Sequence, residues 1–107
     1  MNVKVIWTEL ALNELALIYQ YLLDNTSPNI AKGIIEDILD TSQLEIFPQS
    51  GTIELNLKNL DKEYRYIIRG HEKFEIICRI DNDVVYIVDI FDCRKDPKQM
   101  ATRIKRK

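Results

Sequence analysis

Hydrophobic residues recur along the first part of the chain with the period of a helix. Residues 3–7 form a short run rich in β-branched side chains, which predicts a strand, and Thr8 after it is suited to cap a helix. From there to about residue 24, apolar side chains lie three and four residues apart, as expected of one buried helix face. This stripe consists of Ala11, Leu15, Ile18 and Leu22.

A second amphipathic helix is predicted to begin at Pro28, where the missing N–H of proline would have had no helical partner. Ser27 is suited to cap it. The segment Phe47–Gly51 contains proline and glycine and predicts the end of this helix. Because the connection between the two helices is short, they should form an antiparallel hairpin.

Three runs rich in β-branched and aromatic residues follow, at 64–69, 74–80 and 84–91, with polar turns between them. The last run is apolar at nearly every position, which is typical of a strand covered on both faces. Residues 51–63 read as a loop with at most one irregular extended piece. The order β-α-α-β-β-β predicts an α+β domain in which the hairpin packs on one face of a four-stranded, mainly antiparallel sheet.

Length and composition predict that residues 1–107 form a single folded domain. Of the 107 residues, 46% are hydrophobic and 30% charged, which is typical of a globular protein. No apolar run is long enough to span a bilayer and no signal peptide is evident, so we expect a cytoplasmic protein without a membrane partner. In that compartment Cys78 and Cys93 should be buried thiols, because two thiols cannot build a zinc site alone. No metal or cofactor is expected.

Charge is distributed unevenly along the chain. Residues 1–63 carry a net charge of −6, whereas residues 92–107 carry +5. A basic end of this kind often meets an acidic partner or a nucleic acid. A solvated tail is an equal alternative for its last cations, which are Arg103, Lys105, Arg106 and Lys107.

The element order and several local motifs resemble the RelE/ParE superfamily of bacterial toxins, and the ParE branch more than the ribosome-dependent nucleases. Trp7 and the helix after it resemble the first helix of the family, and Pro48 with Gly51 resembles its Pro-x-x-Gly. The segment 90–96 looks like the apolar pair, His, any residue, Arg, basic residue and Asp that end the last strand. Asp92 stands where the family often has His.

RelE-type members cleave messenger RNA on the ribosome without a metal. The resemblance places Arg65 and Arg94 where such nucleases bind phosphate, and Lys58 and Lys62 in a loop where they often carry lysine. The reaction also needs an acid and a base, and the sequence offers no convincing one after Arg94. An ionised Asp92 would repel the phosphate. The nuclease constellation is therefore incomplete.

ParE-type members instead poison DNA gyrase and need no acid or base. The resemblance then implies that a set of cations contacts the target, namely Arg65, Arg79, Arg94, Lys95, Lys98, Arg103 and Lys105. It also implies a cognate antitoxin that wraps the toxin with a helix and an extended segment, and the basic end predicts acidic character in that segment. The alternatives are a RelE-like endonuclease with the ribosome and messenger RNA as partners, or a decayed toxin that serves as a binding module.

Structural roles compete with these functional ones. Arg79 faces outward on a strand and can pair with Asp89 across the sheet. Arg65 and Arg94 can form ion pairs with Asp92 or Asp96. Several tyrosines are more typical of sheet packing than of base stacking, and the single histidine is expected in a solvated turn; these residues are Tyr64, Tyr66, Tyr86 and His71.

Overall fold

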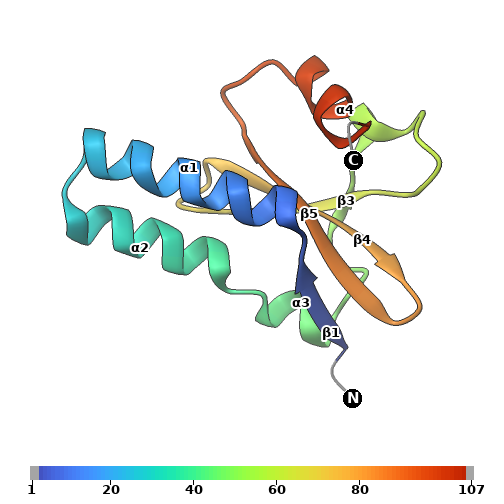
Figure 1. The fold of residues 1–107 in the computed structure, drawn as a ribbon. Coiled ribbons are helices and arrows are strands. Elements are labelled where there is room, and N and C mark those ends of the chain that lie inside the picture. Colours follow the sequence, from blue (N-terminus) through green and yellow to red (C-terminus); the bar gives the residue numbers. More distant parts are fainter. Residues whose placement is uncertain (1–2, 106–107) are drawn as a thin grey trace.

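The computed structural model describes residues 3–105, and side chains as far as residue 104. Its centre is a five-stranded sheet in the order β1-β5-β4-β3-β2 (Figure 1). The first strand pairs with the last in parallel, and the other pairings are antiparallel. The strands are β1 (Lys4–Trp7), β2 (Thr52–Ile53), β3 (Arg65–Arg69), β4 (Phe74–Asp81) and β5 (Val84–Asp92). The predicted α+β class and mainly antiparallel sheet are confirmed.

The predicted helical hairpin is present as α1 (Glu9–Asn25) and α2 (Pro28–Leu39). Thr8 caps α1, since its hydroxyl oxygen accepts the N–H of Ala11 at 3.4 Å. The same hydroxyl donates to the carbonyl of Ile87 on β5 at 2.8 Å, so the cap also fixes the start of the helix against the sheet. No helix among residues 3–105 has the length and apolar character needed to cross a membrane.

The second helix ends earlier than the sequence predicts. It stops at Leu39 instead of continuing to Phe47, and a separate short helix, α3 (Ser42–Ile46), follows. Asp40 has an extended ψ of 99°, and its carboxylate accepts both the N–H and the hydroxyl of Ser42. Side chains of this kind compete with helical backbone hydrogen bonds, which explains the break.

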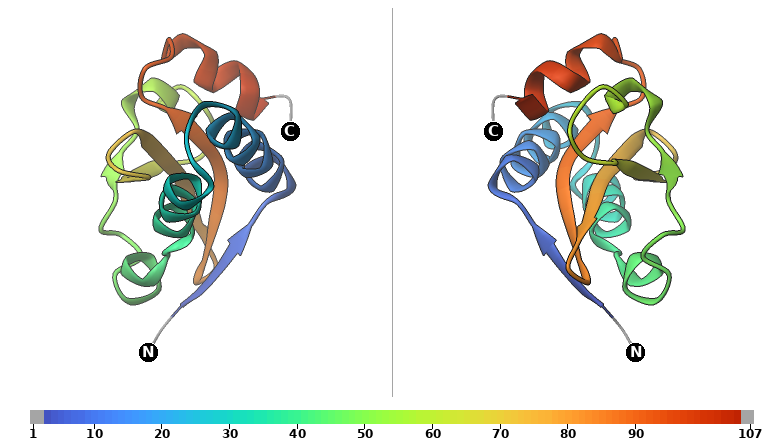
Figure 2. Two further views of the ribbon diagram at one scale, coloured as in Figure 1. Left: turned by 90° about the vertical axis from the view of Figure 1, so that its left-hand side faces the viewer. Right: turned by 90° about the vertical axis from the view of Figure 1, so that its right-hand side faces the viewer.

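The sheet has one strand more than predicted, and two elements lie where loop and tail were expected. The loop contains β2 and the 3-10 turn η1 (Leu55–Leu57), and the basic end forms α4 (Lys98–Lys105). These short elements depend on burial elsewhere in the fold, because Leu57 and Met100 are at most 1% exposed. Figure 2 shows α4 lying beside η1.

Both faces of the sheet are covered. The first-face cluster lies under α1 and α2, and the second-face cluster lies under η1 and α4. β5 serves both, with Ile87 and Ile90 in the first cluster and Val88 and Phe91 in the second. β5 is apolar at nearly every position because both of its faces are covered, as the sequence predicts.

Candidate target-binding surface

Six of the cations that the sequence singles out are divided between two hollows. Lys62, Arg65 and Arg79 line a cleft of about 620 Å³ beside β3 and β4. A groove of about 360 Å³ between α1 and the end of β5 is lined instead by Arg94, Lys95 and Arg103. Lys58 is exposed and lines neither hollow.

Arg65 anchors the loop that precedes its strand. Its Nη1 donates to the carbonyls of Gly51 at 2.9 Å and Gln49 at 3.3 Å, and its guanidinium pairs with Glu63 at 3.1 Å. The side chain is 22% exposed. The ion pair expected for Arg65 is therefore present with a different acid, and most of its donors are occupied within the chain.

Arg79 stacks on Tyr86, with its guanidinium carbon 4.5 Å from the ring centroid, and approaches Asp81 at 3.4 Å. The predicted pairing with Asp89 is wrong. In the observed register Arg79 lies opposite Tyr86, while Asp89 lies opposite Ile77 across an irregularity in the pairing of β4 with β5. The alternation of the sequence could not reveal this shift.

Arg94 forms the predicted ion pair with Asp92. Its Nε and Nη2 donate to the two carboxylate oxygens at 3.0 and 2.7 Å, which is a bidentate arrangement. The hydrogen bond from Arg94 holds the pKa of Asp92 below its usual value. Because the Arg94 side chain is still 58% exposed, it can meet a partner, but a carboxylate of that partner must compete with Asp92.

The remaining exposed cations are at the same end of the molecule. Lys95 lies in the turn after β5, and Lys98 opens α4 with its N–H bonded to Asp96 at 3.0 Å. Neither side chain forms an ion pair among the residues described. The side chain of Lys105, with Arg106 and Lys107, lies outside the described residues.

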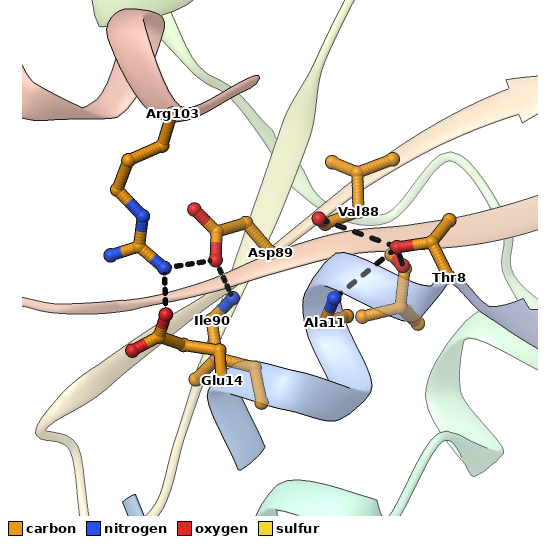
Figure 3. A network of polar contacts seen from close by, with 8 residues as sticks. Thr8, Ala11, Glu14, Val88, Asp89, Ile90 and Arg103 are labelled. Carbon is orange, nitrogen blue, oxygen red and sulfur yellow. Dashed lines mark hydrogen bonds and ion pairs between the residues drawn. The ribbon is translucent and has the colours of Figure 1, made fainter. Parts of the chain in front are cut away.

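Arg103 is directed inward, into a network that joins three elements. It bonds to Glu14 on α1 and, at 2.6 Å, to Asp89 on β5 (Figure 3). Asp89 is fully buried, and this burial raises its pKa to about 6 although Arg103 opposes the shift. Sequence reasoning missed this network, for which the one signal was an acid within the apolar run of β5.

The groove beside Arg94 combines apolar walls with a rim of mixed charge, in which Arg94 is paired with Asp92 and Arg103 with Glu14, while Lys95 forms no ion pair among the described residues. Its floor includes Ile18, Phe74 and Ile90, while Leu17 and Tyr21 on α1 stand at its edge, 65% and 52% exposed. Exposed apolar side chains at such a hollow are typical of a surface that binds another protein. The groove therefore suits a segment that carries both apolar and acidic side chains.

The other predicted residues have structural positions. The three tyrosines Tyr64, Tyr66 and Tyr86 pack against the second-face cluster, and His71 is exposed in the turn between β3 and β4. Cys78 is buried as predicted, but Cys93 is exposed because it follows the end of β5. Within residues 3–105, no three His, Cys, Asp or Glu side chains are grouped to hold a metal ion.

Comparisons with known proteins identify the family and agree with the fold. The family model of the ParE toxin of the type II toxin-antitoxin system parDE matches residues 5–97. Among solved structures, a chain of the chromosomal ParDE toxin-antitoxin system from P. aeruginosa is similar in fold, with a TM-score of 0.70 and 19% identity. The match covers 84% of this chain and 95% of that chain. No match is found among curated protein sequences. Since the family model spans most of the sequence, the chain belongs to the ParE toxins of type II toxin-antitoxin systems.

Proposed function

We propose that this ParE-type toxin acts by binding DNA gyrase, through the exposed cations at the end of β5 and the start of α4, and that it does not cleave RNA. The observation that carries the proposal is the separation of Arg65 from Arg94, which line different hollows. A protein-binding inhibitor needs an accessible charged surface, and Arg94, Lys95 and Lys98 provide one.

Cleavage of RNA makes different demands. Cations that stabilise the reacting phosphate must converge on it together with an acid and a base. Here Arg65 is held by backbone carbonyls and Arg94 by Asp92, and the single histidine, His71, lines neither hollow. These positions support inhibition by binding over catalysis.

The first experiment measures gyrase supercoiling with purified toxin. The double variant Arg94→Ala with Lys95→Ala should raise the half-inhibitory concentration at least about tenfold, since a few charge contacts contribute about 1.4 kcal/mol or more. Lys32→Ala is the matched control, because this exposed lysine lies on α2, lines neither hollow and is paired with Glu36. Its inhibition should equal that of the unchanged protein.

A translating extract provides the opposing test. The proposal expects messages to remain intact at toxin concentrations that stop gyrase. Message cleavage that disappears in both Arg65→Ala and Arg94→Ala would overturn it in favour of a nuclease. Inhibition of neither process by folded protein would support a binding module without toxicity.

The groove beside Arg94 is our proposed contact for the cognate antitoxin. An amphipathic acidic segment would place apolar side chains over Phe74 and Ile90 and its carboxylates towards Lys95. Leu17→Ser with Tyr21→Ser should weaken the complex, whereas Leu12→Ser should not, because Leu12 is 48% exposed on α1 but does not line the groove. Equal effects of the two changes in a binding titration would contradict this placement.

A further inference from the structure

Two carboxyl groups meet on the second face of the sheet, that of Glu54 buried and that of Glu75 half-buried. Glu54, in the connection between β2 and η1, is 3% exposed, and Glu75 on β4 lies within hydrogen-bonding reach of it. Glu54 Oε2 and Glu75 Oε1 are both buried and have no other hydrogen-bond partner. Two buried acceptors that face one another need a donor between them.

Lys58 and Lys62 line a hollow beside Glu54, but neither forms an ion pair with it. None of the ion pairs among the described side chains includes Glu54 or Glu75. The strand neighbours of Glu75 are Ile68 on β3 and Phe91 on β5. The other titratable groups nearby are the thiol of Cys93 after β5 and, in the hollow beside Glu54, the side chains of Asp61, Glu63 and Tyr64. A proton on one carboxyl is therefore the donor that the site requires.

The remaining contacts of Glu54 show what such a proton would hold in place. Its other oxygen, Oε1, accepts the N–H and side-chain amide of Asn56 at 3.1 and 2.9 Å, which fixes the start of η1. Its backbone N–H donates to the carbonyl of Tyr64 at 2.8 Å. η1 in turn buries Leu57 in the second-face cluster and contacts α4. The polar contacts of the buried Glu54 thus hold residues 52–60 against the sheet.

We propose that Glu54 and Glu75 share one proton, and that this proton holds residues 52–60 against the sheet, so that its loss releases the segment and opens the second-face cluster. This proton-dependent attachment of residues 52–60 does not depend on the proposed binding of gyrase. Its chemistry is that of a carboxyl pair in which both members cannot ionise together. Release requires no ligand and depends on pH alone.

The pH range follows from the same surroundings. Burial, and then the neighbouring Glu54, raise the pKa of Glu75 to about 8. The proton is then present in roughly nine tenths of molecules at pH 7 and in roughly one tenth at pH 9. The segment should accordingly be closed near neutral pH and loosened in mild alkali.

The test combines a titration with a protease. Carbon-13 NMR of the glutamate carboxyl groups should show Glu75 titrating near pH 8 and returning towards its usual range in Glu54→Gln, whose amide donates to the carboxylate. Trypsin cleavage after Lys58 reports opening of the segment. Glu75→Gln is the matched variant, because its amide replaces the shared proton and does not titrate.

The ratio of the cleavage rate at pH 9 to that at pH 7 should be up to about ninefold larger for the unchanged protein than for Glu75→Gln, following the change in protonated fraction. The change in trypsin activity with pH is common to both proteins and cancels. Equal ratios, or a Glu75 that titrates at the usual value of a glutamate, would overturn the proposal. If Glu75→Gln does not fold, Glu54→Gln serves as the non-titrating partner in the same comparison.

Discussion

Asp89 occupies a position where the strand pattern alone would place an apolar residue. Its carboxylate accepts from Arg103 and from its neighbouring N–H at Ile90, but Oδ2 has no hydrogen-bond partner. Removing a charge from water often costs as much as its ion pair returns. Asp89 therefore orients α4 against α1 and β5 more than it stabilises the fold.

The pH dependence of stability tests this balance at the level of one residue. The pKa of Asp89 is raised from 3.8 to about 6 in the folded protein, so the folded state holds this proton more tightly than the unfolded state. Its contribution is complete below pH 4 and is lost as the pH rises to about 6 and slightly beyond. Relative to Asp89→Asn, the unchanged protein should lose about 2 kcal/mol of unfolding free energy between pH 4 and 7.

Urea unfolding of both proteins at several pH values measures that difference. Groups that titrate in both proteins, including Glu75, cancel in the comparison. Parallel stability profiles from pH 4 to 7 would show that Asp89 is ionised throughout and that Arg103 outweighs its burial.

At the level of elements, two glycines should respond to alanine in opposite ways. Gly70 has a φ of +69° in the turn after β3, and a Cβ there would lie 2.6 Å from Phe74 Cδ2. Its N–H also donates to Asp37 on α2 at 2.6 Å, so the turn cannot shift freely. Gly70→Ala should cost about 1–3 kcal/mol.

Gly33 is the matched control inside α2. A Cβ there meets no atom within 4 Å, so Gly33→Ala should stabilise the protein by about 0.5–1 kcal/mol through helix propensity. Thermal or urea unfolding measures both changes. A loss of stability in Gly33→Ala, or none in Gly70→Ala, would contradict the described packing of α2 against the turn.

The elements that the sequence predicts are those with a local cause. The α1 stripe and the alternation in β4 follow from neighbouring residues, as does the Arg94–Asp92 pair two positions apart. η1 and α4 are too short for a reliable period and form because Leu57 and Met100 are buried by distant parts of the chain. The contacts of Arg103 also join distant parts of the chain, because Asp89 and Glu14 lie 14 and 89 residues away in the sequence. The sequence pattern therefore could not assign these partners to Arg103.

At the level of the whole molecule, β4 and β5 belong to both hydrophobic clusters. On β4, Ile76 packs in the first-face cluster and its neighbour Ile77 in the second, and both are fully buried. Neither face can lose its packing without disturbing strands that the other face uses. The chain should therefore unfold in one cooperative step although its two clusters are separated by the sheet.

Met100 tests this coupling from the far side of the molecule. It is fully buried in the second-face cluster, so Met100→Ala should lower the unfolding free energy by about 2–5 kcal/mol. Because both faces unfold in the same step, amide exchange in α1, on the opposite face, should accelerate by the factor by which the unfolded fraction increases. Gln99→Ala is the control, since Gln99 is exposed on the same helix. If Met100→Ala accelerates exchange in α4 and η1 but leaves α1 protected, the second face opens by itself, and α4 behaves as a separable cover over the sheet.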